Sequence, residues 1–459
     1  MLEKLRRAVA GLAERIGKAG RRKSAASGAP SGDTLSGRFL EVFTGSDGLV
    51  SVAVVVLGFL VATLILVAIG RNPGGMYEAI VQVVTGFDIR PGRGAWDAFL
   101  GMWRDIPQVF RDFLDVFRRG EYQTWDAFLA FLQRAFAPRA GWSPRHVGEW
   151  LLTSTPLILC GLSMAFAART GLFNIGAEGQ YIVGLTAAQI IALSFPPVPV
   201  LHLVVSVGGA VLAGAAWGGV VGFFKARYRV SEVVATIMMN YIALFFHRIV
   251  TLRLPGALPH RTPDFPETAT LASPFLASLT GGSRLNYGLW LTLMAIVAYW
   301  LIMRKTRLGY SLRATGLNRD AAHYGGINVK ASITAAMAIA GGFAGLAGGV
   351  VSLGVFSFGR VLTGFEGFGF EGIAVALVGN STAWGVALAG LLFGMLRSAQ
   401  PIMQMRMIPR EITSIIVGMV VIFISLRAGL RLLIDWRMKE QARGKRDAVG
   451  ESGAKGDAP

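Results

Sequence analysis

Polar and glycine residues separate two long apolar runs at residues 171–180. Asn174, Glu178 and Gln180 stand there among three glycines, between the runs Trp150–Ala168 and Tyr181–Phe195. Such groups beside membrane-spanning segments are costly unless they face protein, water or a bound solute. Their donors and acceptors suit sugar hydroxyls or the edges of a base, and the glycines allow turns that expose the backbone. The alternative, that these groups satisfy neighbouring helix ends and hold the fold, stays equally open.

Further polar and aromatic residues in apolar surroundings are candidates for the same task. Glu232 and Asn240 resemble the first set, although a packing role is favoured for them. Glu366 and Glu371 flank a glycine- and phenylalanine-rich stretch that could form an outer gate. Three phenylalanines of this stretch can stack on a planar ring: Phe365, Phe368 and Phe370.

The residue types that enzymes need are not grouped in any recognisable pattern. The five histidines are scattered with no metal-ligand spacing, and no phosphate-binding GxxxxGK[ST] loop or GxSxG elbow occurs. The single cysteine, Cys160, lies inside an apolar run. We therefore expect no catalytic residue, no metal and no cofactor in this chain, and no ATP hydrolysis by it through such a loop.

Composition places the chain in a membrane. Of its 459 residues 53% are apolar and only 16% are charged, and the apolar residues form runs long enough to cross a bilayer. The run Leu49–Ile69 has no polar face, unlike a helix of a soluble domain. The net charge of +18 does not indicate nucleic acid, because the basic clusters flank apolar spans, as positive-inside loops do.

The pattern predicts an all-α, polytopic membrane protein with about ten transmembrane helices and both termini in the cytosol. Arg397, Arg406 and Arg410 fall on the outer side of this topology and count slightly against it. The piece 371–380 is too short for a straight crossing and is expected to be broken or re-entrant. The expected spans are about 49–70, 149–169, 174–195, 199–223, 233–252, 286–303, 330–353, 371–380, 383–399 and 411–429.

Around these spans we predict five regions. The insert contains a repeat, Trp96–Leu100 and Trp125–Leu129, and is expected to form amphipathic helices at the outer face. A packing role is favoured for it over a dock for a substrate-delivery protein. The regions are a basic cytosolic segment 1–48, a first transmembrane helix 49–70, an extracytoplasmic insert 71–147, a core 148–430, and a disordered cytosolic tail 431–459.

Glycines recur at four-residue spacing along two of the expected spans. Gly214, Gly218 and Gly222 form one ridge, and Gly341, Gly345 and Gly349 form the other. Such ridges let helix backbones approach closely in lipid. Packing within one chain is the favoured interpretation, and a role in a pore or a dimer is the alternative.

Four blocks together resemble the permease subunits of bacterial ATP-driven (ABC) importers for nucleosides and simple sugars, in the ribose and branched-chain amino acid permease family. One block alone would be weak, but the four follow the family's order at suitable membrane positions. They are Thr155–Ile158 leading into Gly171–Gln180, Val230–Tyr241, Gly309–Asn328 and Gly367–Gly379.

The resemblance implies a type II-like importer permease in the bacterial inner membrane. Its implied partners are a second permease subunit, identical or homologous, an ATP-binding cassette ATPase that binds ATP and magnesium, and an extracytoplasmic substrate-binding protein. The cargo would be a nucleoside or a simple sugar. The candidate substrate path is Asn174, Glu178, Gln180, Asn240 and Phe368.

The third block is implied to hold a short cytosolic coupling helix that fits a groove of the ATPase. It is expected to begin near residues 317–320, with Asn318 as its cap, against the alternative of an ordinary charged loop. The residues expected to couple are Arg313, Gly316, Asn318, Arg319, Ala322 and Tyr324. The competing function is a self-sufficient secondary carrier or channel, which would need ionisable groups deep within the spans.

Overall fold

The computed structural model describes residues 47–87, 89, 100 and 142–422. The elements below belong to one compact unit, Gly58–Val421, apart from the first part of α3. The predicted basic N-terminal segment, the repeat of the insert apart from Leu100, and the predicted C-terminal tail lie outside the described residues.

The described residues are predominantly helical, and each of the ten predicted spans corresponds to a helix in them. Six helices are long and apolar enough to cross a membrane: α7 (Pro144–Ala168), α9 (Leu201–Tyr228), α10 (Glu232–Leu252), α12 (Gly288–Lys305), α15 (Val329–Val355) and α17 (Ala383–Met405). The others are α3 (Asp47–Ala68), α8 (Ala177–Ser194), α16 (Phe368–Val378) and Glu411–Ile422. The all-α, polytopic fold is confirmed.

Short polar side chains begin several of these helices. The Asn328 amide oxygen accepts from the backbone N–H of Ala331 at 3.0 Å and starts α15. The Thr382 hydroxyl accepts from Gly385 N–H at 3.2 Å and starts α17. Each cap satisfies one of the N–H groups that a helix start leaves without an intrahelical partner, so the sequence fixes these boundaries locally.

The two glycine ridges pack against each other inside this chain. A Cβ atom placed on Gly214 would lie 2.4 Å from the Gly341 carbonyl oxygen, and one on Gly345 would lie 2.3 Å from that of Ala210. Gly218 meets Met337 in the same way, so α9 and α15 run antiparallel at backbone contact. The interpretation as packing within one chain is confirmed, and it follows from the close approach that glycine permits in lipid.

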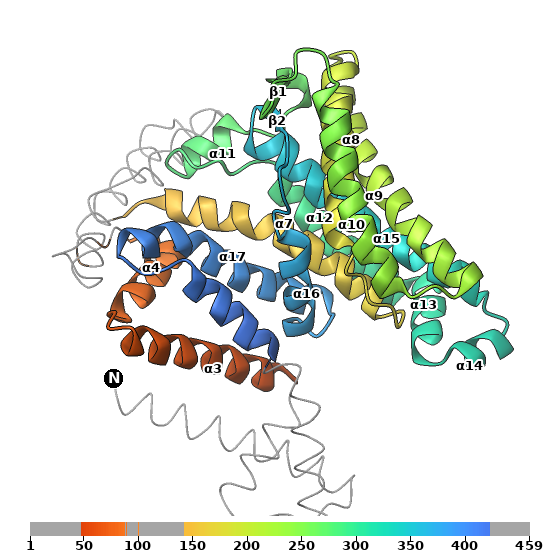
Figure 1. Ribbon diagram of the computed structural model, residues 1–459, viewed down its shortest axis with the longest axis horizontal. Coiled ribbons are helices and arrows are strands. Elements are labelled where there is room, and N and C mark those ends of the chain that lie inside the picture. Colours follow the sequence, from red (N-terminus) through yellow and green to blue (C-terminus); the bar gives the residue numbers. More distant parts are fainter. Residues whose placement is uncertain (1–46, 88, 90–99, 101–141, 423–459) are drawn as a thin grey trace, which may run out of the picture. The chain divides into compact units, whose positions relative to one another are not determined.

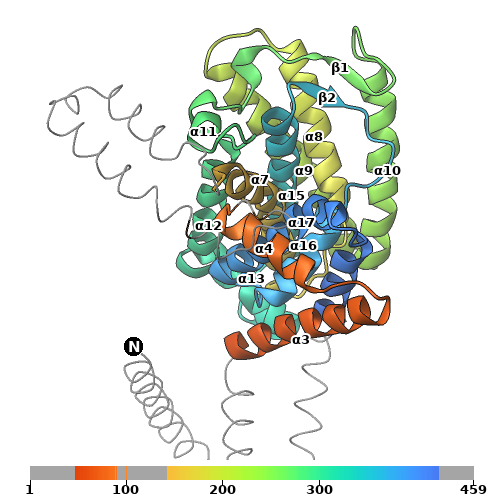
Figure 2. The ribbon, with the colours of Figure 1, turned by 90° about the vertical axis from the view of Figure 1, so that its left-hand side faces the viewer.

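Helix α8 lies within the bundle and packs on α15, α9 and α10. Its polar residues Glu178, Gln180 and Gln189 are all buried. Helices α7 and α17 form a second antiparallel pair, in which Gly390 meets Ile158 and Gly394 meets Ser154. Figures 1 and 2 show α15 beside α8 and α9, and α17 beside α7.

Two sets of short elements mark opposite ends of the bundle (Figure 1). One end, called the hairpin end here, carries the antiparallel strands β1 (Arg261–Asp264) and β2 (Phe358–Arg360), with η2 and α11. The other end carries α13 and α14. Helix α4, at the start of the predicted insert, packs on α17 and α7. The bounds are α4 (Gly74–Thr85), η2 (Glu267–Ala269), α11 (Pro274–Leu279), α13 (Arg307–Leu317) and α14 (Arg319–Tyr324).

The crossing between β2 and the turn before α17 is half helical. Residues 361–367 are non-helical and lead from the hairpin end into α16, which has only 11 residues. At about 1.5 Å per residue such a helix spans roughly 16 Å, half of a hydrocarbon layer of about 30 Å. The prediction of a broken helix here agrees with this geometry.

The arginines that counted against the topology have polar partners. Arg397 pairs with Glu371 at 3.0 Å, and Arg406 pairs with Glu78 of α4 and donates to the Ile89 carbonyl at 2.8 Å. Arg410 pairs with Glu411 at 3.2 Å. All three arginines thus have a carboxylate partner within the fold.

Candidate functional site

A buried carboxylate holds the break in the membrane crossing. Glu178 is fully buried at the start of α8, and its two carboxylate oxygens accept from Gly367 N–H at 2.8 Å and Gly369 N–H at 2.6 Å. These N–H groups stand at the first turn of α16, where they have no intrahelical partner and where the helix dipole favours a negative charge. Glu178 is therefore the cap of α16, supplied from a distant part of the sequence.

Three further residues of the candidate substrate path are buried and engaged with one another or with backbone. The Asn174 and Gln180 amides bond reciprocally at 2.8 and 3.1 Å, and Asn174 also donates to the Ser163 hydroxyl at 3.1 Å. The Asn240 oxygen accepts from Gly179 N–H at 2.8 Å, and its NH₂ donates to the Ile175 carbonyl at 3.1 Å. These bonds hold the first turn of α8 against α7 and α10; contact with a solute stays a prediction for these residues.

Partly accessible charges surround the break. The Arg360 guanidinium meets Glu366 through two bonds of 2.5 and 3.1 Å, and the Tyr181 hydroxyl donates to the same carboxylate at 2.5 Å. Burial alone would lower the pKa of Arg360, but its hydrogen bonds and charge interaction with Glu366 outweigh burial and raise that pKa. The pair joins β2 to the non-helical half of the crossing.

A second charged pair lies on the other side of the break. Arg397 of α17 pairs with Glu371 and donates to the Glu366 carbonyl at 2.9 Å. Its guanidinium lies 4.0 Å from the centre of the Phe368 ring, and this ring lies 5.6 Å from that of Tyr181. Phe368, the aromatic member of the candidate path, is thus brought together with the charged residues. The side chains of Glu371 and Arg397 are 32% and 25% exposed, so both are accessible to a small solute.

An aromatic cluster continues this accessible surface. The Phe365 ring meets Tyr241 of α10 edge-on at 5.2 Å and Phe370 of α16 at 5.6 Å. Tyr241 is 50% exposed and Phe370 is 38% exposed, which leaves ring area for contact with a solute. The sequence pointed to the phenylalanines, whereas Tyr241 was noted only as the last residue of a block.

His247 holds the non-helical half of the crossing. From the sequence it counted only among the scattered histidines. The Nε2 atom of His247, on α10, accepts from Leu362 N–H at 3.1 Å, which leaves Nδ1 to bond Thr186 of α8 at 2.8 Å. The imidazole is fully buried. The sequence did contain a signal for this role: His247 lies in the middle of an apolar span, where ionisable residues are rare and usually functional.

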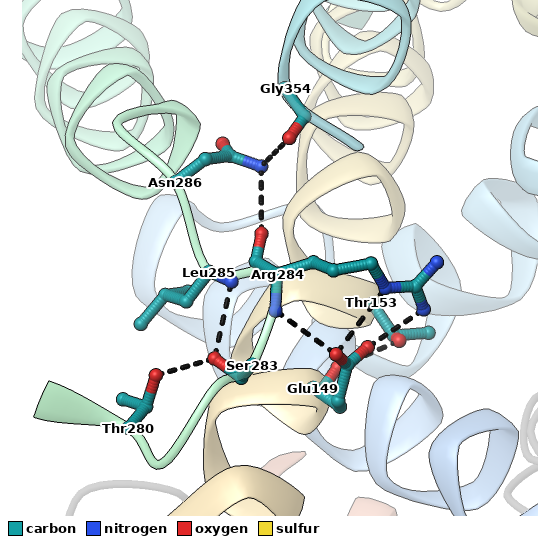
Figure 3. A network of polar contacts seen from close by, with 8 residues as sticks. All are labelled: Glu149, Thr153, Thr280, Ser283, Arg284, Leu285, Asn286 and Gly354. Carbon is teal, nitrogen blue, oxygen red and sulfur yellow. Dashed lines mark hydrogen bonds and ion pairs between the residues drawn. The ribbon is translucent and has the colours of Figure 1, made fainter. Parts of the chain in front are cut away.

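A polar network fixes the hairpin end of α7 (Figure 3). Arg284 donates to the Glu149 carboxylate from its backbone N–H at 3.0 Å and from its guanidinium at 2.8 Å. Asn286 donates to the Gly354 carbonyl at 2.9 Å. In Figure 3 these contacts join α7, the loop before α12 and the end of α15. The end of α15 that leads into the broken crossing is therefore anchored.

The predicted coupling segment consists of two helices, α13 and α14, where the sequence predicted a single short one. The Asn318 oxygen accepts from the N–H groups of Asp320 and Ala321, both at 3.0 Å, so the predicted cap is confirmed. It stands in extended backbone between the helices, which is why the chain turns there. Ala322 is buried, whereas Tyr324 is 96% exposed and Leu317, missed from the sequence, is 88% exposed. An exposed leucine thus precedes α14, and an exposed tyrosine ends it.

The end of α13 rests directly on the loop after α7. A Cβ atom on Gly316 would lie 2.4 Å from the Arg169 carbonyl oxygen. Arg319 donates to the Gly171 carbonyl at 3.4 Å. Arg313 is half-buried, and one of its terminal nitrogens has no hydrogen-bond partner in the described part of the chain. Two of the six predicted coupling residues, Gly316 and Arg319, therefore lie at this junction.

The same loop also holds the far end of α16. The Arg169 guanidinium donates to the carbonyls of Ser381 at 2.9 Å and Asn380 at 3.0 Å, in the turn between α16 and α17. Residues 169–178 thus touch α13 and α14, the end of α16 through Arg169, and the start of α16 through Glu178. Among the described residues, this segment is the one that the contacts above join to the α13–α14 pair, to the start of α16 and to the turn after α16.

Comparison with known proteins agrees with this architecture. Residues 147–425 match the family model described as the branched-chain amino acid transport system / permease component. The guanosine ABC transporter permease protein NupP of Bacillus subtilis is 41% identical over 65% of this chain and 86% of that protein. The nucleoside ABC transporter permease protein NupB of Lactococcus lactis is 36% identical over 64% and 82%. The ribose import permease protein RbsC of Escherichia coli is 30% identical over 47% and 63%. No solved structure matches.

Proposed function

Since the chain belongs to the family of permease components typified by branched-chain amino acid transport systems, and is a multi-pass ABC importer permease subunit, we propose that its cargo is a nucleoside. Support comes from the two relatives named for guanosine and nucleoside transport, which align over most of their own length. Simple sugars are the second choice, supported by the relative named for ribose.

The observation that carries the cargo proposal is the accessible surface at the break in the crossing. The rings of Tyr241, Phe365 and Phe370 offer stacking faces and edges for a planar base. Glu371 and Arg397 supply an acceptor and donors within reach of ribose hydroxyls.

In this proposal the buried residues position the surface that contacts the solute. Glu178 fixes the first turn of α16, which presents Phe368 and Phe370, while Asn174, Gln180 and Asn240 fix the turn that carries Glu178. Their hydrogen bonds are already made within the protein, so a solute would have to displace them at a cost of about 1 to 3 kcal/mol for each group left unpaired.

The energy source is proposed to be a separate ATPase that binds ATP and magnesium. Leu317 at the end of α13 and Tyr324 at the end of α14 are the exposed contacts for a groove of that subunit. Motion of α14 would reach α16 through Gly316 and the loop 169–178, because this loop contacts both ends of α16. The α14 end then faces the cytosol, and so do both chain termini.

The remaining partners are a second permease subunit, identical or homologous, and an extracytoplasmic substrate-binding protein at the hairpin end. Two relatives from one organism, NupP and NupQ of Bacillus subtilis, are both named guanosine permeases and are 41% and 27% identical to this chain. This supports, for that system, a pair of different permease chains. The bilayer in question is the bacterial inner membrane.

The test is uptake by proteoliposomes that contain the chain with its ATPase and binding protein. We expect ATP-dependent uptake of guanosine in preference to ribose. Phe370→Ala should raise the guanosine concentration for half-maximal uptake by roughly five- to 150-fold, because a base stacked on an aromatic ring gains about 1 to 3 kcal/mol. The control is Trp290→Ala on α12, an exposed aromatic residue outside the cluster.

Two results would reject the proposal. Ribose uptake that exceeds guanosine uptake would move the cargo to the sugar class. Uptake driven by an ion gradient, in vesicles that hold no ATPase, would instead identify a secondary carrier or channel.

A further inference from the structure

A groove of about 850 Å³ lies where the end of α9 meets α14 and the start of α15. We call it the basic groove. Four cationic side chains line it together with one carboxylate, that of Asp320, and the imidazole of His323. The cations come from three separate elements: Lys225 and Arg229 from the end of α9, Arg319 from α14, and Lys330 from α15.

The charge of the basic groove is only partly balanced inside the protein. Lys225 pairs with Glu232 at 2.5 Å. Within the described residues, neither Arg229 nor Lys330 forms an ion pair, and both are exposed. Asp320 offsets one positive charge, so the groove keeps an excess of cations that a bound anion would neutralise.

The groove lies at the end of α9, one of the helices that are long and apolar enough to cross a membrane. Only 28% of the apolar stretch of α9 is buried, because the helix packs on α15 through its glycines and leaves other side chains free to face lipid. Its last turns carry Phe223, Phe224 and Tyr228, all exposed, with ring centres 6.0 to 6.2 Å apart. Tyrosine is enriched at the membrane–water interface, so Tyr228, three residues after Lys225, suits a position at that interface.

We propose that the basic groove binds the headgroup of an anionic phospholipid. A phosphate needs several cations from different directions, and the three elements provide them. Basic pockets between helices at the cytoplasmic side suit such headgroups, while acyl chains would lie along the exposed face of α9. A soluble phosphate compound shares the headgroup's charge but gains nothing from the apolar surface.

A bound headgroup would join α14 to α9 and α15. Residues Arg319, Asp320 and His323 belong to α14 and line the groove. The lipid would therefore hold the helix that, under the proposed function, contacts the ATPase. This consequence rests on the proposed function, whereas lipid binding itself does not.

The experiment measures lipid binding by the purified full chain in a neutral detergent, without any partner. Native mass spectrometry follows titrations with phosphatidylglycerol, phosphatidylcholine and inorganic phosphate. The test variant combines Arg229→Asn with Lys330→Gln; asparagine is chosen because residue 229 has φ +58°, a conformation that asparagine tolerates. The control, Arg227→Gln, removes a cation from the same helix end that does not line the groove.

We expect phosphatidylglycerol to bind more tightly than phosphatidylcholine or phosphate. The double variant should weaken this binding roughly twenty-five-fold, at about fivefold for each basic residue near an anionic headgroup, and the control should not. Thermal unfolding of each variant checks that the fold persists.

Four outcomes would overturn the proposal. Equal binding of phosphatidylcholine would remove the role of charge, and equal loss in the control would remove the role of the groove. Phosphate that binds as tightly as phosphatidylglycerol would assign the groove to a soluble anion. If the isolated chain binds no lipid while the double variant weakens ATPase association, the groove belongs to that interface. A failure of nucleoside uptake would leave this assay unaffected.

Discussion

Substitution of Gly316 by alanine tests the contact between α13 and the loop after α7. The new Cβ atom would lie 2.4 Å from the Arg169 carbonyl oxygen and 2.9 Å from backbone atoms of Thr170. Carbon–oxygen contacts normally measure about 3.3 to 3.6 Å, so the two backbones must separate by roughly 1 Å. No flexible side chain lies between them to absorb that change.

The magnitude follows from the rigidity of both partners. Overpacking of a close backbone contact costs about 1 to 3 kcal/mol of unfolding free energy. The displaced loop carries Arg169, which binds the Asn380 and Ser381 carbonyls, and leads to Glu178. We therefore expect uptake to fall more than ATP hydrolysis, so that uptake per ATP hydrolysed decreases, since α16 would lose its fixed relation to α14.

The matched control is Gly325→Ala, nine residues further along the same pair of helices. Its nearest neighbour would be the Ala321 carbonyl oxygen at 3.4 Å, an ordinary contact, and its φ of −74° suits alanine. Stability and coupled transport should change little in this variant.

The assay has two readouts that separate folding from coupling. Thermal unfolding of the purified chain measures stability, and proteoliposomes with the ATPase and binding protein measure uptake per ATP hydrolysed. The reasoning fails if Gly316→Ala keeps both the wild-type melting temperature and the wild-type coupling ratio. It also fails if Gly325→Ala lowers the coupling ratio as much.

Three further substitutions have defined outcomes. Asn318→Ala should destabilise α14 by about 1 kcal/mol, because two N–H groups lose their acceptor, and Asn318→Ser should recover part of that loss in thermal unfolding. Glu178→Gln places an amide NH₂ against an N–H group at the start of α16 and should cost about 1 to 3 kcal/mol; a wild-type denaturation midpoint would show that Glu178 does not cap this helix. Gly345→Ala should destabilise the α9–α15 pair and reduce membrane yield, whereas Gly219→Ala, whose nearest contact would be 3.5 Å away, should do neither.

Features that depend on neighbouring residues were readable from the sequence. Each span is a run of apolar residues, and each run became a helix because a backbone in lipid must satisfy its hydrogen bonds within the segment. The Asn318 cap is equally local, since its acceptor reaches N–H groups two and three residues ahead. The ridges led by Gly214 and Gly341 were visible for the same reason, and packing within one chain was the favoured interpretation, but only the structure shows that the two ridges contact each other.

Features that depend on partners far along the chain were not readable. Glu178 could equally have faced a solute, and only the fold places its carboxylate on Gly367 and Gly369. Arg397 counted against the topology until the structure paired it with Glu371. His247 looked isolated because its partners lie in other elements.

The sequence by itself determined which segments lie in lipid and where several helices begin, because hydrophobicity and capping act over a few residues. Only the tertiary structure decided which polar groups are already engaged and which stay accessible. A buried donor takes whichever acceptor packing brings within 3 Å or so, and packing joins residues such as Glu178 and Gly369 that are 191 positions apart.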